Sequence, residues 1–517
     1  MSIVSRWSVF GLVLASGIGI TGCVSVDPRR DYEIARQRVA EATGQTTPFA
    51  VEDRDAIISL VAGRMEGGLT ADEAVQVALL NNPKIWASFQ RIGMARADVV
   101  QSGLFSNPTV GISFRFPDGG GLADFELSLA QNIADLWMIP ARKQVAERDL
   151  DRAILDTARE AASLAFDAKV AYFNAVASER TLGIAHDNLA LVNELLKIAE
   201  ARQQAGAVGA LDVNLIRGLV LKAEVELRTA RLEAASAKRT LATLLGLASP
   251  ADDLVLSDAL PVPQQMPLDA SRLLEIAADA RLDLRAARDA VLAAQARVEA
   301  EYAKVFQNVE VGFALERNAR RAQPERKIAA DTARASIANG TLTAPDIQSR
   351  GQRRLERSQE IEAILGPSLS LTLPIFDQNR AQIAKARYAY QESTALLATL
   401  ERTVAKETND ALDRATTAWG VTQLYEAEVL PQVRTTLELS QAAYQAGSAP
   451  ILTVIDAQRS LLETQRNYVA ALQSATTAVV DLERATARPM SVLLDMPAEA
   501  TKPSKSQPTE RGQTGKP

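Results

Sequence analysis

Alternation of apolar and polar residues marks four short segments of the chain. In the clearest of them, residues 367–376 (PSLSLTLPIF), every second residue is apolar. A period of two is that of a β-strand whose two faces meet different surroundings. The pattern predicts strands at about residues 109–116, 124–131, 308–316 and 367–376.

The first two predicted strands form a β-hairpin, because a Pro-Asp-Gly-Gly-Gly turn at 117–121 separates them. One face of the four strands carries apolar residues: Val110, Ile112, Phe114, Leu127, Leu129, Val311, Phe313, Leu369, Leu371 and Leu373. The opposite face is small or polar, for example at Ser113, Glu126, Ser128 and Ser370.

Four strands are too few to close a barrel, and an open sheet leaves its edges unpaired. In a membrane, edges must be removed by closure, and apolar-out, polar-in alternation is typical of outer-membrane barrels. Three chains would supply twelve strands. The alternative is a soluble sheet packed on the chain's own helices.

Elsewhere the period is helical. The predicted helices are 69–105 with an interruption at Asn81-Asn82-Pro83, then 140–206, 211–245, 268–307, 378–447 and 452–488. Thr70 and Glu73 have the spacing of a capping box, and Asp269 or Ser271 can cap the helix that follows. A helix of some 65 residues is ~100 Å long.

The same order of elements occurs twice, in residues 69–249 and 268–490, with a Pro-rich linker at 250–267. NPTVGI at 107–112 parallels NVEVGF at 308–313, and QAG at 204–206 parallels QAG at 445–447. The second copy has an Arg- and Glu-rich insertion at 318–365. It is interpreted either as a solvated helical excursion or as a contact with phosphorylated surface lipid.

The N-terminus has the features of a secretory signal in residues 1–22: Arg6, then an apolar run, then Ile20-Thr21-Gly22 before Cys23. Cys23 is the chain's single cysteine, and the sequence around it resembles a bacterial lipobox, which predicts acylation of Cys23 as a lipoprotein. The alternative is an ordinary signal peptide with an incidental cysteine. Residues 23–68 are expected to be a lipid-anchored tether, and residues 491–517 a disordered tail.

The composition narrows the class of protein. With 47% apolar, 5% aromatic and 23% charged residues in 517, it favours long packed helices over a compact enzyme. The net charge of −6 predicts no nucleic-acid partner. One cysteine and one histidine, His186, provide little material for a metal site, a cofactor or a nucleophile pair, so we expect neither a cofactor nor catalysis.

Two stretches resemble the TolC family of outer-membrane efflux proteins. They are LPIFDQNR at 373–380, and QAG at 445–447 followed by IDAQRSL at 455–461. The lipobox and the two-fold repeat point to the lipoprotein branch that serves pumps of the resistance-nodulation-division type. The resemblance implies a mainly α fold with a small β part. It implies a homotrimer with a twelve-stranded outer-membrane barrel continued by an α-helical tunnel across the periplasm. The expected partners are a periplasmic adaptor protein and an inner-membrane pump.

The resemblance also implies roles for individual residues. Gly206 and Gly447 are expected to end their helices as left-handed C-caps. Asp456 matches a family position where carboxylates from three chains ring the closed tunnel mouth, and Asp212 lies near the equivalent place in the first copy. The alternative for both is a solvated carboxylate near a helix N-terminus. The expected adaptor-docking turns comprise Gln204, Gly206, Gln445 and Gly447.

The predicted function is a passive exit duct for an efflux pump. The alternatives are a structural periplasmic coiled-coil lipoprotein, which leaves the strands unexplained, and a TolC-type duct for protein secretion. Metal ions and organic solutes are both open as cargo.

Overall fold

The computed structural model describes residues 25–46, 54–65, 67–116, 123–247, 254–262, 269–319, 337–340 and 361–495. They divide into two compact units. The sheet unit comprises Met1–Pro28, Ile92–Ala153 and Ala287–Leu397, and the hairpin unit comprises Arg29–Arg91, Ile154–Ala286 and Ala398–Pro517. Each unit takes segments from both sequence repeats. Cys23, the turn at 117–121, most of the insertion and the tail beyond 495 lie outside the described residues.

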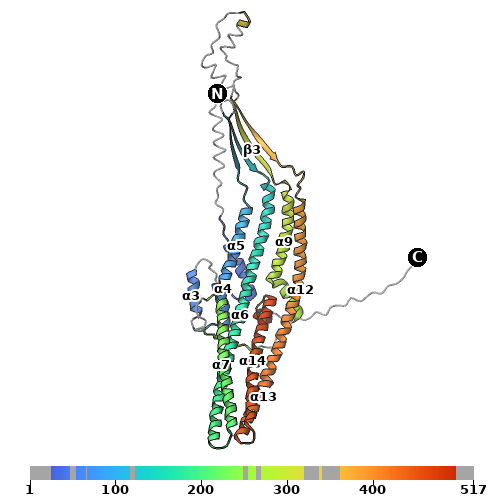
Figure 1. The fold of residues 1–517 in the computed structure, drawn as a ribbon. Helices are drawn as coiled ribbons and strands as arrows, with labels where there is room; N and C mark the ends of the chain where they lie inside the picture. The colour runs from blue at the N-terminus through green and yellow to red at the C-terminus, as the bar shows by residue number, and fades with distance from the viewer. Residues whose placement is uncertain are drawn as a thin grey trace, which may run out of the picture. The chain divides into compact units, whose positions relative to one another are not determined.

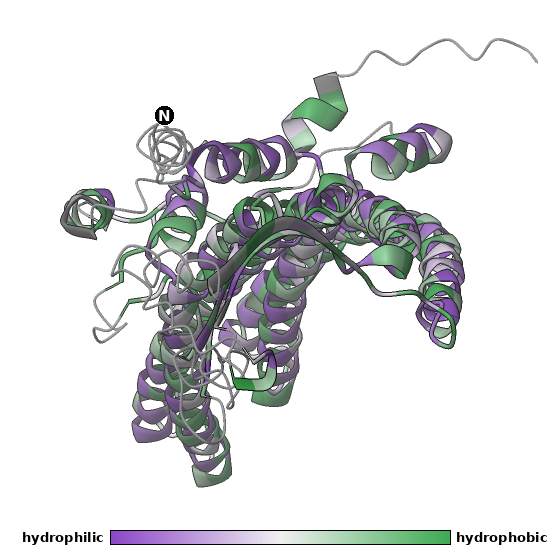
Figure 2. Cartoon of the chain, turned by 90° about the horizontal axis from the view of Figure 1, so that it is seen from above, coloured by the Kyte–Doolittle hydropathy of each residue, from purple (hydrophilic) through white to green (hydrophobic). Residues whose placement is uncertain are grey.

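The sheet unit holds one antiparallel sheet in the order β1-β2-β3-β4 (Figure 1). The strands are β1 Thr109–Arg115, β2 Asp124–Asn132, β3 Val309–Ala319 and β4 Ile361–Leu371. The register sets apolar residues opposite one another, as in Val110 with Leu129, Leu129 with Phe313, and Val311 with Leu369. Seen from above, the sheet is a curved band (Figure 2). Its edge strands, β1 and β4, have no outer partner among the described residues.

The apolar face of the sheet is exposed. Ile112 is 61% exposed, Phe313 58% and Leu369 71%. The soluble alternative required the chain's own helices to cover this face, and the described helices do not.

The fourth strand differs from its predicted bounds of 367–376. It runs from Ile361 to Leu371, because it is paired along its whole length with β3, from Ala319 opposite Ile361 to Val309 opposite Leu371. Gly366-Pro367 breaks the alternation, so the period of two does not show the first half of the strand. Leu373 therefore lies outside β4, in a tight turn where the Ile375 backbone N–H donates to its carbonyl.

The helices before and between the strands are mostly long. Thr70 and Glu73 form both bonds of the predicted capping box, and Asp269 accepts from Ser271 N–H as a cap. The predicted helix at 268–307 is divided at Arg281, whose backbone is extended. The bounds are α2 Arg29–Thr43, α3 Arg54–Met65, α4 Ala71–Asn81, α5 Pro83–Ser102, α6 Asp135–Gln204, α7 Ala210–Leu244, α8 Ala270–Ala280 and α9 Leu282–Ala303.

After β4 the chain continues as α12 Arg380–Leu424, a π-helical turn Tyr425–Val429, α13 Leu430–Gln445, α14 Ile451–Thr486 and α15 Met490–Asp495. The π-helical turn interrupts what the sequence predicted as one helix. Of the helices that the structure describes, none has the length and apolarity needed to cross a bilayer.

The hairpin unit contains two helical hairpins (Figure 1). The first hairpin is α6 from Ile154 onward with α7, and the second is α12 from Ala398 onward, continued through α13, with α14. Both colours of the hydropathy scale alternate along each helix in Figure 2, as expected for helices that each bury one stripe.

Candidate functional site at the hairpin ends

The two hairpins end in the same kind of turn. After α6, Gly206 N–H donates to the Gln203 carbonyl at 2.9 Å and Ala207 N–H to the Arg202 carbonyl at 2.8 Å. After α13, Gly447 N–H donates to the Tyr444 carbonyl at 3.0 Å and Ser448 N–H to the Ala443 carbonyl at 2.9 Å. Both pairs of bonds form a Schellman motif, which satisfies the last carbonyls of the helix.

The glycines in these turns are needed for backbone conformation alone. Gly206 has φ +73° and Gly447 φ +75°, as predicted for left-handed C-caps. A Cβ at either position would meet no atom within 4 Å, so neighbouring side chains do not demand glycine. The adjacent Gln204 and Gln445 are exposed. The turns are thus open surface, and their role in docking stays a prediction.

A shared hydrophobic core lies behind the turns. It draws on α6, α7, α13 and α14, so each hairpin end is packed against the other. Its buried members are Ala199, Val213, Ile216, Leu437, Tyr444, Ile451, Val454 and Ala457.

One cation joins the two hairpins at this core. The Arg202 Nη1 donates to the Tyr444 carbonyl at 3.0 Å, and its guanidinium lies 4.6 Å from the centre of the Tyr444 ring. Tyr444 is 5% exposed, and its hydroxyl has no hydrogen-bond partner among the described residues. This pair could not be predicted, because nothing in a single sequence links positions 242 residues apart.

The two candidate gate carboxylates lie beyond the turns. Asp212 is in the first turn of α7 and partly exposed, while Asp456 is in the second turn of α14 and exposed. Within the described residues, neither side chain makes a hydrogen bond or ion pair, and none joins the two. One chain does not bring them together, so their role as a gate stays a prediction.

The residues around these carboxylates differ between the repeats. Gln458 is buried and donates to Asn188 Oδ1 at 3.2 Å across the two hairpins. When the two repeats are aligned on their QAG turns, Arg217 occupies the position of Gln458. Arg217 is exposed and pairs with Glu200 at 3.0 Å within the first hairpin. The side chain at this repeat position thus contacts the other hairpin in the second copy and its own hairpin in the first copy.

Further polar pairs join the hairpins along their length. The Gln473 amide donates to Asn174 Oδ1 at 2.8 Å, and Arg466 pairs with Glu226 at 3.2 Å. Lys169 pairs with the buried Glu483 at 2.7 Å. Together with Gln458 and Asn188, these pairs form a polar ladder between the hairpins.

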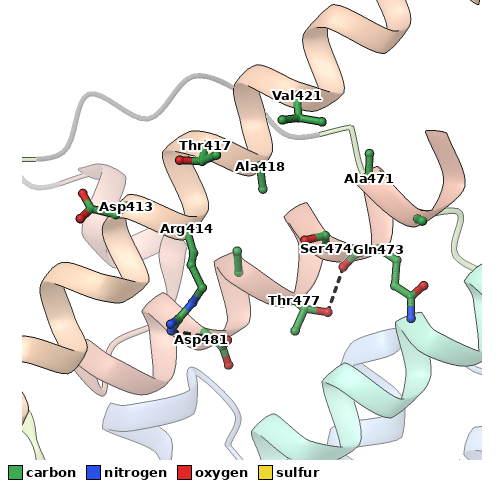
Figure 3. A pocket seen from close by; sticks show the side chains of 12 residues that line it. Asp413, Arg414, Thr417, Ala418, Val421, Ala471, Gln473, Ser474, Thr477 and Asp481 are labelled. Carbon is green, nitrogen blue, oxygen red and sulfur yellow. Dashed lines mark hydrogen bonds and ion pairs between the residues drawn. The ribbon is translucent and has the colours of Figure 1, made fainter. Parts of the chain in front are cut away.

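The second hairpin is hollow along part of its length. A groove of about 730 Å³ lies between α12 and α14 (Figure 3). Small residues such as Ala418, Ala471 and Ser474 line it, and Arg414 and Asp481 approach to 3.8 Å across one end. Small side chains on both helices leave the space unfilled.

The described residues contain no cluster of histidine, cysteine or acidic side chains that could hold a metal ion. His186 is exposed on α6, with its Nδ1 3.9 Å from Asp187.

A model of the outer membrane efflux protein family matches residues 74–247 and 273–488. The matched segments fall within the two repeats of the sequence.

Curated relatives and a solved structure agree with this match. The pyoverdine export outer membrane protein OpmQ of Pseudomonas putida is 26% identical, over 80% of this chain and 85% of that protein. The cobalt-zinc-cadmium resistance protein CzcC of Cupriavidus metallidurans is 23% identical, over 84% of this chain and 95% of that protein. A crystal structure of CusC, described in its title as bearing on transmembrane channel formation, has a TM-score of 0.61 and 18% identity, over 80% of this chain and 91% of that one.

Proposed function

Because this chain belongs to the outer membrane efflux protein family, we propose that it forms the passive exit duct of a tripartite efflux assembly. The chain is an outer-membrane efflux component that extends into the periplasm. The resemblance to the TolC family drawn from the sequence is confirmed. The proposal adds a homotrimer that opens when a periplasmic adaptor and an inner-membrane pump of the resistance-nodulation-division type assemble with it.

One observation carries the trimer: an exposed apolar sheet face whose two edges have no partner among the described residues. An edge strand in a bilayer leaves backbone N–H and C=O groups unsatisfied, each at a cost of several kcal/mol, on the order of the penalty for burying an unpaired polar group. Pairing β4 of one copy with β1 of the next removes every edge. Three copies then form a twelve-stranded barrel with the apolar face toward lipid.

An exposed stripe on α7 supports the same assembly. Leu221, Val225 and Leu232 are 60%, 64% and 65% exposed, at the spacing of a coiled-coil seam. Helices of a neighbouring copy would cover it.

The hairpin ends supply the gate and the docking surface in this proposal. Asp456, supported by Asp212, would ring the closed mouth with three-fold carboxylates, and the turns at Gly206 and Gly447 would receive the adaptor. Acylation of Cys23 would add a second membrane anchor. No catalytic role is proposed. The relatives' names differ in cargo, pyoverdine in one and cobalt, zinc and cadmium in another, so the cargo of this duct is left open.

Planar-bilayer conductance of the purified full-length protein tests the proposal. We expect an SDS-resistant, heat-modifiable trimer with low conductance that Asp456→Ala raises, together with weaker block by divalent cations. Asp456→Asn, which keeps size but removes charge, should behave like Asp456→Ala. Absence of both the trimer and any conductance would reject the duct. Unchanged conductance and cation block in both variants would reject Asp456 as the gate.

A further inference from the structure

A groove of about 510 Å³ lies in the sheet unit, between the end of α9 and the start of α12. Tyr302 of α9 lines one wall. The other wall is one face of α12, with Arg380, Ile383, Arg387, Tyr388 and Gln391.

The charged side chains described in this groove are basic, with no acidic side chain among them. Arg387 donates to the Tyr302 hydroxyl, and its guanidinium lies 5.7 Å from the ring centre. No carboxylate lies among the described residues that line the groove, and neither Arg380 nor Arg387 has an acidic partner in the described chain. The two guanidinium groups therefore keep donors free for an anion.

A second groove on α9 shows that this charge pattern is not general. It has about 550 Å³ and is lined by α5, α6 and α9, with acidic residues such as Asp98 and Glu301 beside basic ones such as Arg297. Consecutive residues of a helix are about 100° apart, so Glu301 and Tyr302 point into different grooves. Basic and acidic side chains thus line the groove of α5, α6 and α9 together, whereas the charged residues described in the groove of α9 and α12 are basic.

Exposed aromatic residues lie near the strand ends to which α9 and α12, the two helices of the cationic groove, lead. One end of every strand lies at the side of the sheet where the helices attach: β1 and β3 begin there, and β2 and β4 end there. Each strand has an aromatic residue within five positions of that end. These are Phe105 before β1, Trp137 after β2, Phe306 before β3 and Phe376 after β4, at 59%, 39%, 46% and 100% exposure. Aromatic residues at such positions mark the boundary between the hydrocarbon and the headgroups.

We propose that the groove of Tyr302, Arg380 and Arg387 binds the headgroup of an anionic glycerophospholipid from the leaflet that faces the helices. Guanidinium groups bind phosphate oxygens with two parallel hydrogen bonds, and free tyrosine hydroxyls can donate a further one. The ring of Tyr388, which is 71% exposed, offers apolar surface to the glycerol and first acyl carbons. Tyr302 and Arg380 each lie four residues from one of these aromatic residues, Phe306 and Phe376, on the helical side of the boundary, where lipid phosphates would lie. The inference rests on the sheet being in the outer membrane but not on gating or adaptor docking.

Native mass spectrometry of the delipidated full-length protein, titrated with dioleoyl-phosphatidylglycerol, tests the site. Losing charge-assisted hydrogen bonds from two guanidinium groups should weaken binding by at least roughly 10-fold in R380Q/R387Q. The matched control is K385Q/R402Q, which removes two cations from the same helix outside the groove. It should stay within about twofold of the wild type, because these exposed charges do not line the groove and solvent screens them. R380K/R387K, which keeps charge but loses bidentate geometry, should lie between them.

Each variant must first show the wild-type conductance and heat-modifiable mobility, so that loss of the lipid cannot be ascribed to misfolding or to failure of the duct. Equal phosphatidylglycerol binding in R380Q/R387Q and the wild type would overturn the site. Equal binding of phosphatidylcholine and phosphatidylglycerol by the wild type would also overturn it. Full competition by millimolar inorganic phosphate or glycerol 3-phosphate would show a free-phosphate site and overturn the lipid assignment.

Discussion

The two hairpins have the same turn but differ in how they are built behind it. The first hairpin has in α6 an unbroken helix to Gln204, and large residues such as Val192 and Val220 fill the space between α6 and α7. The second is interrupted by the π-helical turn Tyr425–Val429, with Pro431 as the second residue of the helix that follows, and the groove lies between α12 and α14. π-helical turns and prolines bend helices, and small residues leave room for movement.

The difference indicates that the duplicated halves have diverged in stiffness. The first hairpin is a packed strut. The second has its unfilled groove just before the π-helical turn, where it can change its bend, and beyond that turn α13 is held in the shared core by Leu437 and Tyr444. The polar ladder and the Arg202–Tyr444 pair then hold the second hairpin against the first. We expect opening to break these pairs and to leave the first hairpin in place.

Single-residue deletions should give the largest difference in stability between the two hairpins. Deleting Ala427 removes the extra residue of the π-helical turn and keeps the register of α13, so the free energy of unfolding should fall by no more than about 3 kcal/mol, the cost of placing Pro431 inside a regular helix. Deleting exposed Ala190 rotates the end of α6 by about 100° and mispacks Val192 and Ala199, at a cost above about 5 kcal/mol. Denaturant unfolding measures both. Equal tolerance of the two deletions would contradict the difference in stiffness. The Ala427 deletion should also lower adaptor-induced conductance.

Removing the Tyr444 ring should release the second hairpin from the first. Tyr444→Ala empties a buried site and should cost about 3–5 kcal/mol. Tyr444→Phe should be close to neutral, because the hydroxyl it removes has no partner among the described residues. Hydrogen exchange at residues 437–457 and 195–216 reports the effect. If phenylalanine proves as costly as alanine, the hydroxyl has a partner and the ring is not the main contact.

Replacing the glycine should cost the same stability in both turns. Gly206→Ala and Gly447→Ala place a Cβ in left-handed backbone with open space around it, so each should cost about 1–2 kcal/mol. Asparagine at either position should cost less. Hydrogen exchange of the turn amides in the four variants checks this. A much larger cost at one turn would show that the two ends are not equivalent.

Acid should loosen the second hairpin by a smaller amount. Arg281 pairs with Asp283 of α9 and with Glu407 of α12, each at 2.6 Å. Burial alone raises the pKa of Asp283, but the hydrogen bonds and charge of Arg281 outweigh it and hold the pKa below its usual value. A lowered carboxyl pKa stabilises the fold above the unfolded pKa, near 3.9, and this stability is lost as pH falls through the lowered value.

The contribution of Asp283 to the folding stability should therefore be flat from pH 7 to about pH 5 and fall by about 1 kcal/mol or less below about pH 4, since the pair is partly exposed. Asp283→Asn should remove this part of the acid response. Thermal unfolding against pH measures it. A decline that is complete above pH 5 would assign the response to other groups.

Local rules predicted most elements correctly. Alternation found β1 and β2 almost to the residue, and Gly206 and Gly447 were identified as C-caps because left-handed backbone favours glycine. The start of β4 was missed because Gly366-Pro367 obscures the period, and only pairing with β3 sets its length. The π-helical turn was missed because no local residue pattern distinguishes it from an α-helix.

The sequence by itself determined the strands with one apolar face, the long helices, the repeat and the two glycine turns. These depend on the period of side chains and on backbone conformation, both properties of neighbouring residues. Only the tertiary structure decided which residues meet across the hairpins and which grooves stay unfilled. Arg202 reaches Tyr444, and Arg380 joins Tyr302 in one groove, because packing brings together positions that are far apart along the chain.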